Sequence, residues 1–373
     1  MSSTPRKRLA PEALVAGFVV VVLAVLVLAV FFSGLGRSLY PPDAATIQAE
    51  NVRGLYDIVF ALAVAIFLAV EGLIVWSILR YRRKPGDDVL PVQTHGNNTV
   101  EVIWTLIPTV IVLYLFAISW QSLNTVNALS DAPDIRIHAV AAQFQWQFEY
   151  LDANGKKVVT QTVPLASDGG GMAVPVGKKI HVTLDSPDVI HAFYVPRFLF
   201  KRDVVPGQTN TFEFTVDPSE ASDGHPAIFR GQCAELCGTG HRTMLFNVVG
   251  MTQTDYDAWL AALVVKANAT PAPAPSGATV FHLVAKDIAY DQHAFEVAAN
   301  QPFVIDFQNQ DSGITHDVDI RQNDKTTVVQ DQPITEGGAT SSYNYNGLPP
   351  GTYVFICSIH PTVPAMSGVL TVK

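Results

Sequence analysis

Three long runs of apolar residues occupy the first third of the chain, at about residues 13–32, 58–79 and 102–120. Each run has about the 20 residues that a helix needs to cross the hydrocarbon core of a bilayer. Basic residues precede the first run at positions 6–8 and follow the second at positions 80–84. The pattern predicts a transmembrane helical hairpin within residues 51–123. The preceding segment, residues 1–36, is predicted to be either a secretory signal or a retained anchor helix.

The basic cluster at positions 80–84 also predicts the orientation of the chain in the membrane. Lys and Arg accumulate on the cytoplasmic side, which puts the loop between the last two runs inside the cell. The third run then carries everything after Gln121 to the outside, whether or not the first segment is cleaved. We therefore expect a multi-pass membrane protein whose remaining domains are extracytoplasmic.

Beyond residue 132 the pattern changes to short segments rich in β-branched and aromatic residues, separated by turn pairs such as Asn154-Gly155 and Pro206-Gly207. Many short strands with regular turn signals are typical of a β-sandwich. We place one such domain at residues 124–266, with a short closing helix at residues 255–267. Residues 267–277 are rich in Pro and Ala and predict a linker. The β pattern then resumes over residues 278–373, so that two all-β sandwiches follow the helices.

Composition and charge narrow the classes of function. Of the 373 residues 49 % are hydrophobic, a high share for a wholly soluble protein. Residues 91–373 hold 26 acidic and 15 basic residues, a balance of −11, which is the wrong sign for binding nucleic acid. The chain has three cysteines, and two of them lie four residues apart. This spacing fits metal binding better than a disulfide framework.

The loop at positions 231–244, GQCAELCGTGHRTM, carries the clearest chemistry. It holds two thiols, Cys233 and Cys237, followed by His241 and Met244. Thiolate, imidazole and thioether ligands together favour copper among the first-row metals. A structural zinc site is the alternative for a Cys-x3-Cys-x3-His string. His191 follows a predicted strand at an end-loop position and is expected to complete the set. Two thiolates exceed the need of one blue-copper ion and suit two copper ions bridged by both sulfurs.

The other histidines of this domain are expected to be packed or exposed residues and not ligands: His138, His181 and His225. A second set of soft ligands lies in the C-terminal domain. Two imidazoles, one thiolate and a weak thioether are typical of a mononuclear blue-copper centre, and the set consists of His316, Cys357, His360 and Met366. Even without Met366, the other three residues would make a copper site.

At this point the sequence resembles a known family. The motif Cys-x-Glu-x-Cys-x3-His-x2-Met at positions 233–244, the upstream His191, the aromatic strand at positions 143–150 and the two preceding spans resemble subunit II of cytochrome c oxidase. The resemblance covers about residues 51–266. It implies a cupredoxin-like fold and a CuA centre, in which Cys233 and Cys237 bridge two coppers while His191 and His241 each terminate one.

The same resemblance implies further roles. Met244 and the backbone carbonyl of Glu235 would supply weak axial contacts, and the Glu235 side chain would reach a magnesium or manganese ion shared with subunit I. Glu101 falls where the family carries the carboxylate at the mouth of a proton-conducting path. Alternatively, it is an acid in the first helical turn, favoured by the helix dipole. Asp188 and Asp203 match family acids near the centre, or are exposed loop charges.

The implied function is that of the electron-accepting subunit of a heme-copper terminal oxidase in a prokaryotic plasma membrane. Such a subunit passes electrons from an external donor, cytochrome c or a small copper protein, to heme in subunit I, where oxygen is reduced to water. Other oxidase subunits and the lipid membrane would be further partners. A CuA subunit of a nitric oxide reductase and a membrane-anchored copper-binding or delivery protein are the alternatives.

One departure from the family pattern concerns the electron path. The aromatic strand of the family opens with Gln-Trp, and cytochrome c hands over its electron at that Trp. Here the pair is Gln143-Phe144, followed by Trp146 two residues later. The C-terminal domain resembles small blue-copper proteins, the cupredoxins, through its four candidate ligands. We therefore expect electrons to pass from the C-terminal copper to CuA, with Phe144 and Trp146 on the path.

Overall fold

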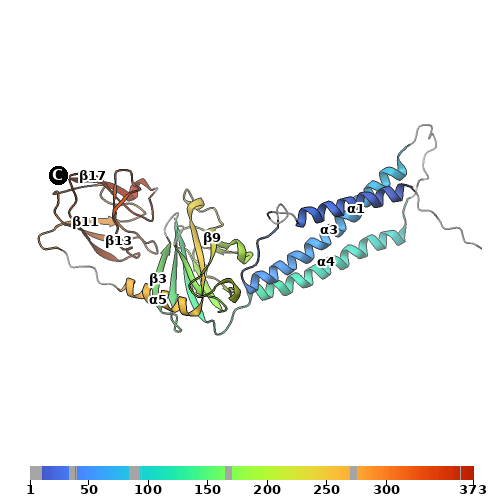
Figure 1. The fold of residues 1–373 in the computed structure, drawn as a ribbon, viewed down its shortest axis with the longest axis horizontal. Helices are drawn as coiled ribbons and strands as arrows, with labels where there is room; N and C mark the ends of the chain where they lie inside the picture. The colour runs from blue at the N-terminus through green and yellow to red at the C-terminus, as the bar shows by residue number, and fades with distance from the viewer. Residues whose placement is uncertain are drawn as a thin grey trace, which may run out of the picture. The chain divides into compact units, whose positions relative to one another are not determined.

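The computed structural model describes residues 11–32, 38, 40–83, 93, 95–163, 170–268, 275–361 and 363–373. The chain forms two compact units, one made of the long helices and one that contains both β-domains (Figure 1). The basic residues at positions 6–8 and most of the predicted linker lie outside the described residues.

The helical unit contains α1 (Pro11–Phe32), α3 (Ile47–Tyr81) and α4 (Asn98–Asn127). Both α3 and α4 are long and apolar enough to cross a membrane. Their apolar side chains are largely exposed, as expected for helices that face lipid or partner subunits. Gly72 lets α1 and α3 approach closely, since a Cβ atom there would lie 2.9 Å from Val20.

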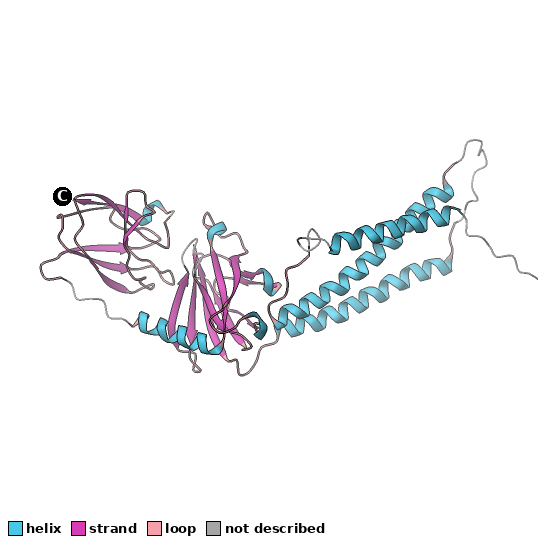
Figure 2. Cartoon of the chain, viewed as in Figure 1, coloured by secondary structure: helices cyan, strands magenta, loops and turns pink. Residues whose placement is uncertain are grey.

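The first β-domain is a sandwich of two five-stranded sheets (Figure 2). One sheet has the order β3-β2-β1-β5-β8 and the other the order β4-β10-β9-β6-β7. Its strands are β1 (Ile135–Ala142), β2 (Gln145–Leu151), β3 (Lys157–Val163), β4 (Gly171–Pro175), β5 (Ile180–Asp185), β6 (His191–Val195), β7 (Phe200–Val204), β8 (Asn210–Phe214), β9 (Ala227–Cys233) and β10 (Leu245–Met251). Helix α5 (Gln253–Ala267) closes the domain and begins at Thr252, whose side chain caps the Asp255 N–H.

Aromatic rings fill the space between these two sheets. Trp146 of β2 is fully buried, and its ring centroid lies 5.9 Å from that of Phe193 and 4.9 Å from that of Phe246. Residues of a strand alternate between its two faces, so the aromatic positions of β2 share the inner face. This core fixes β6 and β9, the strands that carry His191 and Cys233.

The C-terminal domain is a second sandwich, with a three-stranded sheet β11-β13-β16 and a five-stranded sheet β12-β18-β17-β14-β15. Its strands are β11 (Thr279–Ala285), β12 (Ala294–Val297), β13 (Phe303–Asn309), β14 (Asp319–Gln322), β15 (Val328–Gln330), β16 (Thr340–Tyr345), β17 (Gly351–Ile356) and β18 (Ser367–Val372). The predicted fold class, transmembrane helices followed by two all-β cupredoxin-like sandwiches, is confirmed.

Candidate metal centres

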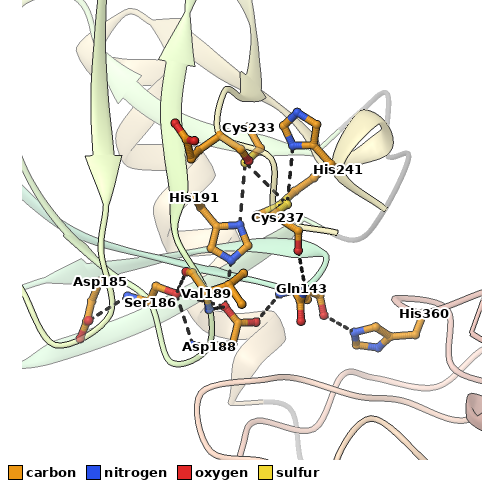
Figure 3. A network of polar contacts seen from close by, with 12 residues as sticks. Gln143, Asp185, Ser186, Asp188, Val189, His191, Cys233, Cys237, His241 and His360 are labelled. Carbon is orange, nitrogen blue, oxygen red and sulfur yellow. Dashed lines mark hydrogen bonds and ion pairs between the residues drawn. The ribbon is translucent and has the colours of Figure 1, made fainter. Parts of the chain in front are cut away.

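The first candidate centre forms where three segments of the first sandwich meet. His191 begins β6, Cys233 ends β9, and the loop before β10 supplies Cys237 and His241. The two sulfurs lie 3.9 Å apart. Each sulfur has its own imidazole, because Nδ1 of His191 lies 3.8 Å from Cys233 Sγ and Nδ1 of His241 lies 3.6 Å from Cys237 Sγ (Figure 3). Two sulfurs between two imidazoles are a donor set that fits two soft metal ions.

The remaining predicted residues of this centre lie on the same loop. Met244 is buried, with Sδ 3.9 Å from Cys237 Sγ. The carbonyl oxygen of Glu235 lies 3.3 Å from Cys233 Sγ. The Glu235 side chain is instead half exposed and pairs with Lys201 Nζ at 3.2 Å. Lys201 also pairs with Asp203, which is a surface charge.

Asp188 orients the buried His191. One carboxylate oxygen lies 2.9 Å from His191 Nε2, so that the other ring nitrogen faces Cys233. Burial would raise the pKa of Asp188, but hydrogen bonds from His191 and from the backbone N–H groups of Gln143 and Val189 outweigh it and lower that pKa. An anionic carboxylate that holds a ligand imidazole is the arrangement found around protein metal sites. Asp188 therefore acts on the centre and is not a free loop charge.

The two thiols ionise as a coupled pair. The hydrogen bond between the two sulfurs is the largest influence on both thiols, and it lowers the pKa of Cys233 while it raises the pKa of Cys237. The first proton therefore leaves this pair easily and the second is retained. Full deprotonation requires added positive charge, as a bound metal cation provides. The donor set therefore fits a cationic metal centre.

The second candidate centre lies in the C-terminal sandwich and is fully buried. Cys357 Sγ lies 3.7 Å from Nδ1 of His316 and 3.5 Å from Nδ1 of His360. Asp311 holds His316 through Nε2 at 2.8 Å, in the same way that Asp188 holds His191. Met366 is buried in the hydrophobic core and accepts the Cys357 N–H at its carbonyl, 3.0 Å away.

Burial controls ionisation at the second centre. It raises the pKa of the Cys357 thiol well above its usual range and lowers the pKa of His360 to about 4, with the nearby His316 as a further cause. Burial therefore favours the neutral thiol of Cys357 and the neutral imidazole of His360, and a thiolate here needs a cation beside it. Two imidazoles and one thiol in a dry pocket fit a soft metal ion such as copper.

The other predicted residues lie on the first sandwich and on α4. Phe144 and Trp146 are both buried, and the Phe144 ring packs against Gly238 and Gly240 of the ligand loop. Glu101 lies in the first turn of α4, where its carboxylate accepts the N–H of Asn97 at 3.2 Å. The three histidines expected not to be ligands lie away from both centres: His138 bonds Glu149, His181 bonds Glu213, and His225 is exposed.

Sequence reasoning missed two residues that touch the centres. Asp311 lies five residues before His316, but nothing in the spacing shows that the chain turns back to join them. Gln143 bonds the backbone of Cys237 and also contacts His360 of the C-terminal domain. No sequence signal indicates this contact, because the alternation of glutamine and aromatic residues at positions 143–148 is also what a strand with a solvated outer face shows.

Comparisons with known proteins agree with this organisation. Family models match three consecutive parts of the chain: the transmembrane domain of cytochrome c oxidase subunit II over residues 35–123, its periplasmic domain over residues 135–251, and a cupredoxin-like domain over residues 258–372.

Two relatives and one solved structure illustrate the similarity. The probable cytochrome c oxidase subunit 2 of Streptomyces coelicolor is 31 % identical over 266 residues, covering 62 % of this chain and 81 % of that protein. The cytochrome c oxidase subunit 2 of Alkalihalophilus pseudofirmus is 34 % identical over 229 residues, covering 58 % and 60 %. The crystal structure of the periplasmic domain of subunit II of cytochrome oxidase from Bradyrhizobium japonicum has a TM-score of 0.32 and 29 % identity, covering 37 % of this chain and 99 % of that one.

Two cupredoxin-like sandwiches with buried groups of Cys and His that could hold metal, joined to apolar helices, define a membrane-anchored protein of the copper-binding class with an extracytoplasmic region. The chain belongs to the cytochrome c oxidase subunit II family. It is therefore a subunit of an oxidoreductase complex, as the motif at positions 233–244 predicted.

Proposed function

We propose that this chain is the electron-accepting subunit of a heme-copper terminal oxidase in a prokaryotic plasma membrane. It takes electrons from an external donor, cytochrome c or a small copper protein, and delivers them to heme in subunit I, where oxygen is reduced to water. The observation that carries the proposal is the pair of sulfurs 3.9 Å apart with one imidazole on each. A closed zinc site uses four ligands around one ion and has no need of the adjacent Met244.

Two coppers at the first centre and one at the second are the proposed metal content. The ligands of the first are His191, Cys233, the Glu235 carbonyl, Cys237, His241 and Met244. Those of the second are His316, Cys357, His360 and Met366. Bound copper supplies a centre that gains and loses one electron, and buried ligands held by carboxylates keep its geometry fixed in both states. The chain supplies that rigidity through Asp188 and Asp311.

We further propose that the C-terminal domain passes electrons to the first sandwich. The burial of Phe144 supports this order, because the turn residue that the family uses to receive electrons is covered here. A short linker makes the transfer intramolecular, with an effective concentration on the order of millimolar.

The remaining assignments belong to the same proposal. The chain divides into an N-terminal signal or anchor (residues 1–36), a membrane hairpin (51–123), the CuA domain (124–266), a linker (267–277) and the C-terminal cupredoxin domain (278–373). Glu101 lies at the mouth of a proton path, and its place in the first turn of α4 is compatible with this role. The Glu235 side chain reaches a magnesium or manganese ion at the interface with subunit I.

A metal count with optical and paramagnetic spectra tests the proposed centres. We expect three coppers per full-length chain, two of them sharing one unpaired electron. Bound zinc would overturn the assignment.

The order of transfer needs a separate test. In the Cys357→Ser variant, and after deletion of residues 268–373, turnover of the oxidase complex with its native donor should slow while the two-copper signal persists. His282→Ala serves as the control, because that histidine is exposed in the same domain. Unchanged turnover in Cys357→Ser would contradict transfer through the C-terminal domain.

A further inference from the structure

A row of glutamines on the first sandwich faces the C-terminal domain. Gln143 lies in the two-residue turn between β1 and β2, while Gln145 and Gln147 lie at alternate positions of β2. Gln145 and Gln147 are only 1 % and 6 % exposed. The loop that precedes β14 covers them, since Thr315 Oγ1 donates to Gln145 Oε1 at 2.7 Å and Gln147 Nε2 donates to the Gly313 carbonyl at 3.0 Å.

Gln143 differs from the other two because it contacts both metal centres. Its main-chain carbonyl lies 3.0 Å from Nε2 of His360. A carbonyl can only accept, so this ring nitrogen carries the proton and the other nitrogen, Nδ1, faces Cys357 at 3.5 Å. The imidazole therefore spans the distance from the thiol of the second centre to the surface of the first sandwich.

Two hydrogen bonds fix Gln143 on its own domain. Its side-chain amide donates to the carbonyl of Cys237, and its main-chain N–H donates to Asp188 at 2.7 Å. Asp188 in turn holds His191 at 2.9 Å. Figure 3 shows this network, with Gln143 between His360 on one side and the Cys237 and His191 residues on the other.

We propose that Gln143 is the positioning residue that couples the two metal centres. Its side chain locks the turn to the Cys237 loop, and the locked turn presents its carbonyl to His360. In each transfer the C-terminal domain is oxidised by one electron and the first sandwich is reduced by one. No bond is made or broken at Gln143, and no proton needs to leave it. This inference rests on the order of transfer proposed above and names the contact through which that transfer runs.

Directional hydrogen bonds across this surface also explain how the two domains recognise each other. The glutamine row offers amide donors and acceptors, which match the Gly313 carbonyl and the Thr315 hydroxyl. At the edge of this surface Lys157 pairs with Glu336 at 2.7 Å. Directional hydrogen bonds fix the register of an interface more than they strengthen it. This register keeps Nε2 of His360 against the carbonyl of Gln143 in the turn between β1 and β2.

Gln143→Ala, with Gln147→Ala as the matched control, tests the inference in the full-length chain within its complex. Gln147 belongs to the same residue type and the same surface, and its side chain itself crosses to the C-terminal domain. The Gln143 side chain does not cross; it bonds Cys237 of its own domain. The electron-transfer rate is measured after rapid photoreduction of the C-terminal centre. We expect transfer to the two-copper centre to slow about fivefold in Gln143→Ala, because loss of one hydrogen bond lowers the population of the correctly positioned turn by about that factor.

Hydrogen exchange of the metal-free full-length chain provides a second readout. Gln147→Ala should raise exchange in residues 312–316, because it removes a bond to that segment, while Gln143→Ala should raise it in the Cys237 loop. If Gln143 has only a structural role, the transfer rate will follow interface protection, and Gln147→Ala will be the slower variant. That order, or a wild-type rate in Gln143→Ala with unchanged copper spectra, would overturn the inference.

The Cys357→Ser variant separates the two levels of the proposal. Slower turnover in Cys357→Ser together with normal transfer in Gln143→Ala would reject the coupling role and leave the order of transfer standing. Normal turnover in Cys357→Ser would reject the order of transfer itself.

Discussion

The packing of Phe144 against the ligand loop makes a sharp prediction for Gly240→Ala. Gly240 has φ −88° and ψ 2°, so an alanine meets no backbone strain there. A Cβ atom at this position would lie 2.5 Å from Cδ2 and 2.9 Å from Cδ1 of Phe144. Carbon atoms in contact sit at about 3.5–4.0 Å, so the ring or the loop must move by about 1 Å.

The ring has little room to make that movement. Phe144 is 7 % exposed, and a Cβ atom at Gly238, on the same loop, would also lie 3.0 Å from it. Overpacking of this kind costs about 1–3 kcal/mol. The loop that would move carries Cys237 and His241, whose donor atoms lie 3.6 Å apart. We therefore expect Gly240→Ala to lose stability and also to bind less copper at the first centre or give an altered visible spectrum.

A double-mutant cycle isolates the clash. Phe144→Ala combined with Gly240→Ala removes the ring that the new methyl group meets, so the coupling energy should be about 1–3 kcal/mol in the rescuing direction. The assays are denaturant midpoints of the metal-free chain and the copper spectrum. Gly351→Ala is the control, because a Cβ atom there would lie at an ordinary 3.5 Å from Tyr353. If Gly240→Ala behaves like this control, or if removal of the ring rescues nothing, the packing argument is wrong.

Two further predictions concern a half-buried acid and a buried thioether. The hydrogen bond from His138 is the largest influence on Glu149 and lowers the pKa of this carboxyl despite partial burial. The hydrogen bond therefore stabilises the fold fully above the unfolded-state pKa of Glu149, and this stabilisation disappears as pH falls through the folded-state pKa. Glu149→Gln should therefore lower the unfolding free energy by about 1 kcal/mol at pH 7, and the difference should shrink as pH falls through the folded-state pKa of Glu149. A difference that stays constant as the solution is acidified would contradict this. Met366→Leu conserves core volume and should lower the unfolding free energy by less than about 1.5 kcal/mol. A changed visible spectrum of the second centre with little loss of stability would therefore identify Met366 as a ligand. An unchanged spectrum would remove Met366 from the ligand set.

The membrane helices show how far apolar pattern alone predicts structure. The second apolar run, at about residues 58–79, lies within α3, which begins much earlier, at Ile47. Hydropathy detects the part of a helix that lies in hydrocarbon and not the polar turns that continue it. The early turns contain Arg53, which donates to the carbonyls of Pro41 and Pro42 at 2.8 and 2.7 Å. Such contacts depend on how the preceding segment folds back, which no periodicity records.

The candidate sites were predictable to the extent that residue type decides the chemistry. Cysteine, histidine and methionine on one loop indicate a soft metal in any fold, and His191 could be chosen because it follows a strand at the end of the sandwich. The residues that orient the ligands were not predictable in this way. The family resemblance points to Asp188 but leaves open that it is an exposed loop charge, and nothing in the sequence points to Asp311. The role of both acids appears only once loop geometry brings a carboxylate within 2.9 and 2.8 Å of an imidazole.

The two faces of β2 relate the presence of Phe144, where the family has Trp, to the presence of the C-terminal domain. The aromatic face builds the core through Trp146, while the glutamine face is covered by the C-terminal domain. A surface held by a few hydrogen bonds and the exposed pair of Lys157 with Glu336 would be a weak site for a separate protein, since each such contact contributes about 1 kcal/mol or less. A tether removes most of the entropic cost of association, so the same surface is occupied without high affinity. A polar and weak contact in a fixed register is then sufficient, and the proposed order of transfer requires no exposed aromatic residue at the turn to capture a donor from solution.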